Sequence, residues 1–304
     1  MSRDGLAIAR VASRTRPGRL AVAVRRAGLY GVLIAGGLMM MIPFFWMFLT
    51  SLKTRAEVFG APPLSLPSGP HFENYVKMWN ALPGVTFGDF FLNSIKIASL
   101  TTIGQLIACS LGAFAFAFLS FRGKGVIFGV LMATLIIPYQ VVLVPNFILF
   151  RNLPNPTSVS GNWIGTQEPL WVPAFLGGAF GIFLIRQFYL TIPVELADAA
   201  RADGANPWQI FRHVYLPLSG PVLATVAIFE FMYSWNDLLS PLIYLHALDQ
   251  YTTTVGLAFF QGQFVGKWPE MMAGALVSLL PMIILFVIAQ KYFVRGIALS
   301  GIKG

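Results

Sequence analysis

Apolar residues dominate this chain in six long runs, and shorter polar segments separate the runs. They cover residues 29–49, 95–118, 126–150, 170–190, 222–245 and 271–289. Each run is close to the length of about 20 residues that an α-helix needs to cross about 30 Å of hydrocarbon. The pattern therefore predicts an all-α integral membrane protein with six transmembrane helices.

The fourth run is the least regular of the six. It is interrupted or flanked by Pro173, Gly177, Gly178, Gly181 and Arg186. A helix bundle tolerates such residues because neighbouring helices and side chains satisfy the freed backbone groups. We expect a span here whose ends the sequence does not fix.

A polar segment, residues 191–217, separates the fourth run from the fifth. Its first half predicts a short helix, because Thr191 can cap the amino end, Pro193 suits the first turn and Glu195 lies where the helix dipole favours an anion. Gly204 is expected to end this helix. Small side chains on this helix would let another protein approach closely, and charged side chains could fix the position of that protein. The small residues are Ala197, Ala199, Ala200 and Ala202, and the charged ones are Asp198, Arg201 and Asp203.

The second half of the polar segment predicts another short helix. Asn206 can cap it, Pro207 suits its first position, and Gln209 stands three residues after the cap, as in a capping box. Pro217 is expected to limit its continuation. These local signals predict a helix, a turn and a helix, and they fit a docking element and an ordinary helical loop equally well.

Composition and charge place the chain in a bilayer and orient it. Of its 304 residues, 56% are hydrophobic and only 11% are charged, which is too apolar for an ordinary soluble domain. Most of the 21 Lys and Arg residues precede the first run, follow the last, or lie between the second and third runs and around the polar segment. Because cytoplasmic segments carry the excess of basic residues, both termini and the polar segment are predicted to be cytoplasmic.

The chain divides into a basic cytoplasmic tail (1–28), a transmembrane domain (29–290) and a cytoplasmic carboxyl-terminal tail (291–304). The first tail is expected to lie along anionic membrane lipid, and the first run is expected to stay as an uncleaved span. The net charge of +9 follows from this topology. No nucleic-acid partner is expected, because a basic patch needs a soluble face on which to track phosphates.

The sequence indicates no catalytic residue, no metal site and no cofactor site in this chain. Cys109 is the only cysteine, and His71, His213 and His246 are far apart in the sequence. Residues 122–125 lack both the spacing and the hydroxyl residue of a nucleotide-binding glycine loop. If ATP drives the protein, another chain binds it.

The fifth run carries polar side chains in apolar surroundings, and such groups in a membrane are functional candidates. Glu230, Tyr233 and Asp237 would share a helix face by their three-then-four spacing. Carboxylates can accept hydrogen bonds from sugar hydroxyls, and aromatic rings can pack on a sugar's apolar face. The same residues would also be explained by packing between helices, or, for Asp237, by a position in water at the external end of the helix. Further candidates for a substrate pathway are Trp235, Asn236, Gln140 and Asn93.

Three motifs in the polar segment carry a family resemblance: Asp198-Ala199-Ala200, Asp203-Gly204-Ala205 and Leu216-Pro217. They resemble the EAA loop of permease subunits in bacterial ABC importers of the carbohydrate uptake type, and the chain is similar to the second permease of maltose-type systems. Flanking motifs at 43–47, 138–142, 181–188 and 235–237 agree with this resemblance. Asp198 is a departure, because the family usually has Glu there.

The resemblance implies a type I importer bundle in the bacterial inner membrane, whose cytoplasmic helix-turn-helix couples it to a dimer of ATPase subunits. ATP and Mg²⁺ would bind to those partner subunits. A second homologous permease and an extracytoplasmic solute-binding protein are the other implied partners. The cargo would be a sugar or a related solute such as a glycerol phosphate derivative. The implied coupling residues are Glu195, Asp198, Ala199, Ala200, Asp203, Gly204, Ala205, Leu216 and Pro217.

Two hypotheses from other classes compete with this one. A secondary transporter or channel driven by an ion gradient would use Glu230 and Asp237 as proton or cation sites. The sequence disfavours it, because the six runs show no obvious inverted repeat and the polar segment would have no role. A membrane scaffold without transport activity would use the polar segment only to bind a partner.

Overall fold

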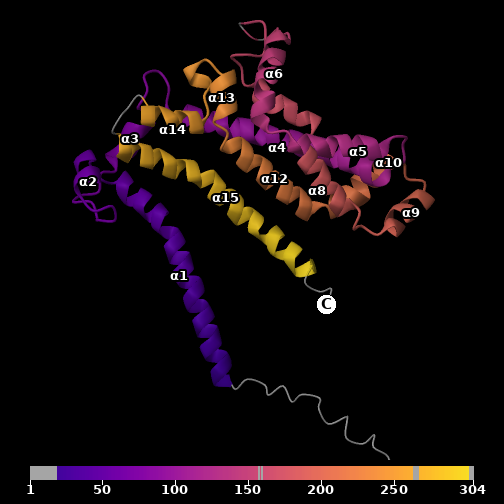
Figure 1. The fold of residues 1–304 in the computed structure, drawn as a ribbon, viewed down its shortest axis with the longest axis horizontal. Helices are drawn as coiled ribbons and strands as arrows, with labels where there is room; N and C mark the ends of the chain where they lie inside the picture. The colour runs from indigo at the N-terminus through magenta and orange to yellow at the C-terminus, as the bar shows by residue number, and fades with distance from the viewer. Residues whose placement is uncertain (1–18, 157, 159, 263–266, 301–304) are drawn as a thin grey trace, which may run out of the picture.

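The computed structural model describes residues 19–156, 158, 160–262 and 267–300, and these residues are almost entirely helical (Figure 1). The predicted all-α fold is confirmed. The tails at 1–18 and 301–304, which the sequence places in the cytoplasm, lie outside the described residues. The α-helices are α1 (Arg19–Ser51), α2 (Arg55–Gly60), α3 (Glu73–Trp79), α4 (Phe87–Phe118), α5 (Lys124–Ala133), α6 (Tyr139–Asn152), α7 (Glu168–Trp171), α8 (Ala179–Tyr189), α9 (Val194–Ala202), α10 (Pro207–Ile210), α11 (Leu216–Leu218), α12 (Gly220–Trp235), α13 (Leu239–Tyr244), α14 (Thr253–Gly262) and α15 (Trp268–Ser300).

Within the described residues, four helical segments are long and apolar enough to cross a membrane. They are Val24–Ser51, Phe87–Phe118, Glu168–Tyr189 and Trp268–Gln290. In two further places, two consecutive helices are long and apolar enough only when they are counted together, and a sharp bend separates the two helices of each pair. The pairs are Lys124–Ile136 with Tyr139–Asn152, bent by 104°, and Pro207–Leu218 with Gly220–Trp235, bent by 78°. The number of candidate spans is six if each bent pair crosses as one.

The third apolar run does not form the single helix that the pattern predicts. After α5 a 3₁₀ turn covers Thr134–Ile136, and the chain then bends at Ile137, which is extended (φ −80°, ψ 115°). The ring of Pro138 disfavours a helical conformation in the residue before it. The bend therefore follows from one proline inside an otherwise continuous apolar run.

The fifth run also departs from the predicted single helix, because α12 ends at Trp235. Asn236 ends it, since its side-chain Nδ2 and its backbone N–H both donate to the carbonyl of Met232, at 2.7 and 3.1 Å. Asp237 follows the end of the helix. The prediction that Asp237 shares a helical face with Glu230 is therefore wrong, although the two residues still line one cavity, as described below.

The fourth run is irregular, as its glycines and proline suggest. The short helix α7 passes into a 3₁₀ turn (Val172–Leu176), which ends at Gly177, whose φ of 80° lies in the left-handed region. A residue with a side chain rarely adopts that conformation. The helix α8 begins two residues later and packs against α4.

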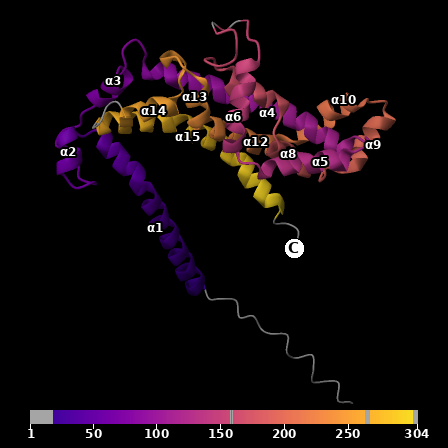
Figure 2. The same cartoon turned by 45° about the horizontal axis from the view of Figure 1, so that its top comes forward.

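The long helix α4 lies at the centre of the molecule and packs against both α8 and α12 (Figure 1). The short helices α9 and α10 lie at one end of this bundle, and α2 and α3 lie at the opposite end, in both views (Figures 1 and 2). Helix α1 contacts α15 and then diverges from the rest of the chain. The two polar ends are therefore separated by the length of the apolar bundle.

Candidate functional site

The polar helix pair α9–α10 packs against the end of the bundle through a few buried side chains. Ala197 is 0% exposed, and Ile210 and Phe211 are buried with it in one cluster. The cluster also takes in Phe114 of α4 and side chains of α8 and α12. This cluster therefore packs α9 and α10 directly against α4, α8 and α12.

The turn between the two helices has the geometry that the sequence predicts. Gly204 has a φ of +84°, and the N–H of Ala205 donates to the carbonyl of Ala200 at 2.9 Å, a pattern typical of a glycine-ended helix. The predicted capping box is confirmed, because the N–H of Asn206 donates to Gln209 Oε1 at 2.8 Å and the N–H of Gln209 donates to Asn206 Oδ1 at 2.9 Å.

One predicted detail of the helix ends is wrong. Thr191 does not cap α9, because its hydroxyl donates instead to the carbonyl of Phe188 at 2.7 Å, and Pro193 stands at the cap position. The second helix ends at Leu218, one residue after Pro217, which agrees with the prediction that this proline limits its continuation. A π-helical segment, Phe211–Tyr215, comes directly before Leu216–Leu218. This wider turn gives room for the proline ring, which would otherwise meet the carbonyl four residues back.

Asp198 faces its own chain. Its Oδ1 lies 2.6 Å from Arg201 Nη1, and the guanidinium of Arg201 stacks on the ring of Phe118 with its Cζ 4.3 Å from the centroid. Exposed ion pairs contribute little energy, so this pair mainly orients Arg201 against the end of α4. The carboxylate that departs from the family pattern thus helps to attach α9 to α4.

The outer surface of the helix pair is exposed, and part of it is apolar. Leu196 is 46% exposed and Trp208 is 56% exposed, on a segment that is otherwise polar. Neither residue was predicted from the sequence, where the available signal was an isolated Leu and Trp within a polar segment. Of the predicted coupling residues, the exposed ones are Glu195, Asp198, Ala199, Asp203, Gly204 and Pro217, and those partly buried against the cluster are Ala200, Ala205 and Leu216.

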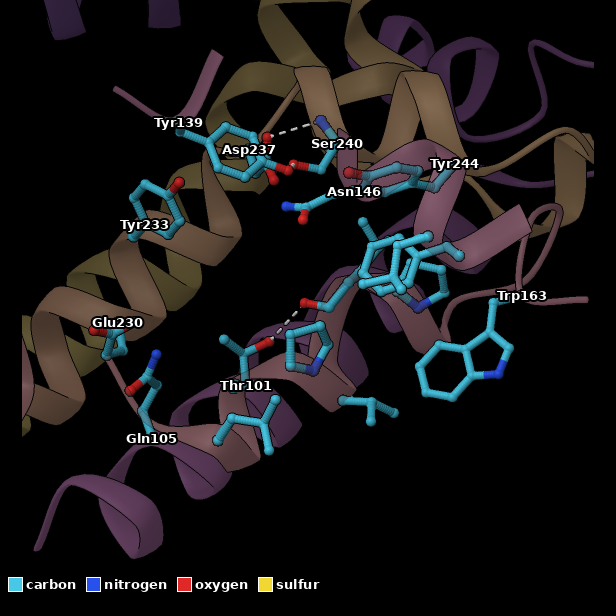
Figure 3. A pocket seen from close by; sticks show the side chains of 18 of the residues that line it. Thr101, Gln105, Tyr139, Asn146, Trp163, Glu230, Tyr233, Asp237, Ser240 and Tyr244 are labelled. Carbon is cyan, nitrogen blue, oxygen red and sulfur yellow. Dashed lines mark hydrogen bonds between the residues drawn. The ribbon is translucent and has the colours of Figure 1, made fainter. Parts of the chain in front are cut away.

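A cavity of about 460 Å³ lies inside the bundle, between α4, α6, α7, α12 and α13. It is lined by three of the predicted pathway residues, Glu230, Tyr233 and Asp237. Figure 3 shows these three along one side, with Trp163 on the opposite side. Its volume is in the range of small-molecule sites.

The polar side of the cavity has hydrogen-bonding capacity that the protein does not use. Asp237 Oδ1 accepts the N–H of Ser240 at 3.2 Å, and the Ser240 hydroxyl lies 2.8 Å from that of Tyr139. Within the described part of the chain, Glu230 forms no hydrogen bond or ion pair, although it lines this wall. Buried polar groups are usually paired, so this wall is suited to a polar ligand.

The other four predicted pathway residues lie away from the cavity. Trp235 is 4% exposed and donates to the carbonyl of Ser278 at 3.2 Å, while Asn236 ends α12. Asn93 donates to two backbone carbonyls near residue 250, and Gln140 is exposed without lining the cavity. Trp235, Asn236 and Asn93 have structural roles here, in agreement with the packing explanation that the sequence left open.

Several residues that line the cavity were not found from the sequence. The polar and aromatic ones are Thr101, Gln105, Tyr139, Asn146, Trp163, Ser240 and Tyr244. They come from four separate regions of the chain, and single polar residues in apolar runs were the only signal. A hydrogen bond from the thiol of Cys109 to Oε1 of Gln105, at 3.0 Å, orients the amide of Gln105. Figure 3 shows Gln105 beside Glu230.

Comparison with known proteins identifies the family. Residues 104–299 match the family described as the binding-protein-dependent transport system inner membrane component. The chain belongs to this family. It is a multi-pass membrane permease of the ABC importer type.

Relatives of this permease agree over most of its length. It is 32% identical over 266 residues to the probable ABC transporter permease protein YurM of Bacillus subtilis (strain 168), which covers 86% of this chain and 83% of YurM. It is 31% identical to the sn-glycerol-3-phosphate permease UgpE of Escherichia coli O1:K1 / APEC, over 88% of this chain and 93% of UgpE. It is 30% identical to the arabinooligosaccharide permease AraQ of Halalkalibacterium halodurans, over 86% and 91%.

A solved structure shares the fold of this permease. It is a crystal structure of a bacterial ABC transporter involved in the import of the acidic polysaccharide alginate. The match has a TM-score of 0.73 and 24% sequence identity, and it covers 89% of this chain and 98% of the other. The type I bundle expected from the sequence is therefore the observed fold.

Proposed function

We propose that this permease forms, with a second homologous permease, the membrane pathway for a sugar, and that ATPase subunits drive it through α9–α10. The substrate is delivered by a solute-binding protein outside the cell. ATP and Mg²⁺ bind to the ATPase subunits, because this chain contains no nucleotide-binding glycine loop. Among the relatives, AraQ is named for arabinooligosaccharides, which supports a sugar as cargo.

The observation that carries this proposal is the two-sided character of α9–α10. The inner side is held in the bundle by Ala197 and Ile210, whereas Leu196 and Trp208 on the outer side are exposed. Apolar side chains on an exposed polar segment favour a protein partner. An ATPase that binds this outer side can therefore move α9 without separating it from the bundle.

The cluster around Ala197 provides the mechanical path from the partner to the cavity. It joins α9 to α4 and α12, which carry Gln105 and Glu230 at the cavity wall. Rigid-body displacement of α9 would change the distance between these walls. Alternation between an inward-open and an outward-open cavity follows from that displacement.

The orientation that we propose has α9–α10 and both termini in the cytoplasm. The helix pair lies at the opposite end of the bundle from α2 and α3 (Figure 1), and the charge pattern of the sequence supports this orientation, because most Lys and Arg residues belong to the segments predicted to share a side with residues 191–217. Helix α1 supports a second permease as partner, because most of its apolar flank is exposed, although it packs against α15 and its end at Ser51 is hydrogen-bonded to Asn74 and Tyr75 of α3. Lipid covers whatever part of this flank a partner does not.

A charge on the outer side of α9 tests the proposal. Leu196→Glu should abolish retention of the ATPase when the importer is affinity-purified through this chain, because it buries a carboxylate in the interface. The matched control is Phe59→Glu on α2, at the opposite end, where Phe59 is 66% exposed; it should retain the ATPase. Full retention in the Leu196→Glu variant would contradict the assignment of the docking surface.

A further inference from the structure

We propose that the cavity accepts uncharged polyhydroxylated solutes and discriminates against anionic ones such as uronates and phosphate esters. This inference rests on the proposed function and narrows its substrate class. Two similar proteins are named for acidic cargo: UgpE, for sn-glycerol-3-phosphate, and the importer of the acidic polysaccharide alginate that shares the fold. The inference distinguishes this permease from both.

The first argument is the charge of the lining. Two side chains with carboxyl groups, Glu230 and Asp237, face the cavity, and no Lys, Arg or His is among the described residues that line it. The nearest lysine along α4, Lys96, points elsewhere, because its Nζ donates to Gln167 Oε1 at 3.0 Å. An anionic ligand would lose its hydration here without gaining a cationic partner.

The second argument is the hydrogen-bonding character of the polar wall. An ionised carboxyl group only accepts hydrogen bonds, and its two oxygens can serve two neighbouring donors. Neighbouring hydroxyls on a sugar ring are such donors, whereas a phosphate or carboxylate of the ligand brings further acceptors. Glu230 is unengaged within the described residues, and Asp237 uses one oxygen for the N–H of Ser240.

The remaining polar groups complete a site for hydroxyls. The amide oxygen of Gln105 accepts a hydrogen bond from the thiol of Cys109, and its NH₂ group can donate beside Glu230. The hydroxyl of Tyr244 also lines the cavity, near Asn146 (Figure 3). These are neutral groups that can donate as well as accept.

The opposite wall is aromatic and apolar, which favours a ring-shaped solute over a small cation. Phe150 and Trp163 lie parallel, with centroids 5.9 Å apart and an interplanar angle of 4°, and both line the cavity. Aromatic faces pack against the C–H faces of sugar rings, while the ring hydroxyls reach the polar wall. A cavity with one acceptor-rich wall and one apolar wall matches an uncharged sugar.

The test uses three β-1,4-linked disaccharides that differ mainly in charge: cellobiose, cellobiouronic acid and the fully deacetylated chitobiose. Equilibrium binding of each radiolabelled compound is measured on the whole importer in nanodiscs, without the binding protein, so that only the membrane cavity selects. Cellobiose should bind at least about tenfold more tightly than cellobiouronic acid. The double variant Glu230→Gln with Asp237→Asn should reduce this ratio to within about threefold.

The control variant removes an acidic charge outside the cavity. Glu73→Gln lies at the α3 end, where Glu73 pairs with Lys77 at 2.6 Å, and it should leave the tenfold ratio unchanged. Equal or tighter binding of cellobiouronic acid, or a preference of about tenfold or more for the cationic disaccharide, would overturn the inference. Lack of binding by all three at millimolar concentration would also overturn it. Retention of the ATPase tests the proposed function separately, so the two failures are distinguishable.

Discussion

Replacing Gly204 with valine should uncouple ATP hydrolysis from transport. Gly204 joins α9 to α10 with a φ of +84°, and no atom outside its immediate neighbours lies within 4 Å of the position that a Cβ would take. The cost is therefore conformational and not steric crowding. A left-handed conformation costs an L-residue about 1–2 kcal/mol, and a β-branched residue tolerates it least. The population of the native turn, relative to other conformations of this segment, should fall by roughly 5- to 30-fold.

The matched control is Gly204→Asn at the same position. Asparagine occupies the same open space but tolerates the left-handed region, so it should stay close to the wild type. The assay reconstitutes this chain with its sister permease, ATPase and binding protein in proteoliposomes, and measures sugar uptake per ATP hydrolysed. Valine should lower this ratio and asparagine should not. Wild-type uptake and stoichiometry with valine would refute the role of the turn, and equal loss with asparagine would refute its conformational basis.

Three further substitutions test other parts of the account. Asn206→Ala should weaken the second helix of the pair by about 1 kcal/mol through loss of its cap, which would appear as faster amide hydrogen exchange in α10; unchanged exchange would contradict the capping role. Ala197→Leu should overpack a fully buried site at a cost of about 1–3 kcal/mol and reduce coupled uptake. Ala202→Leu, on the exposed side of the same helix, should leave uptake unchanged. Equal uptake by the two variants would contradict the proposal that the cluster around Ala197 transmits the movement of α9. Gly104→Leu should lower the thermal unfolding midpoint in detergent, because its Cβ would lie 2.6 Å from an aromatic ring carbon, while Gly129→Leu in open space should leave it unchanged.

The apolar pattern predicts the helices well because membrane depth requires long uninterrupted apolar runs, and those runs are local in sequence. It does not predict where the third and fifth runs break. The bend before Pro138 and the end of α12 at Asn236 each depend on one residue, and hydropathy averaged over about 20 residues hides such a residue. The helix that contains Pro217 does end at Leu218, one residue after the proline, but the π-helical segment before it has no signal in the hydropathy pattern.

The turn and the second cap of the helix pair α9–α10 were predictable because capping and turn signals are local, although the cap predicted at Thr191 was wrong. The capping box at Asn206 and the left-handed Gly204 both occur where the sequence predicts them. The cavity was only partly predictable, because its walls come from distant segments. Glu230 and Tyr233 stood out as polar groups in an apolar run, whereas Gln105 and Trp163 reach the same cavity only through the packing of α4, α6 and α12. Trp235 had the same local signal as Tyr233 but packs against α15.

The most direct test of the central claim is sugar uptake into proteoliposomes, compared between the complete importer and this chain alone. Radiolabelled sugar should accumulate only when the sister permease, the ATPase subunits, the binding protein and Mg-ATP are all present, and Leu196→Glu should abolish this uptake. Accumulation by this chain alone in response to an ion gradient would contradict the claim.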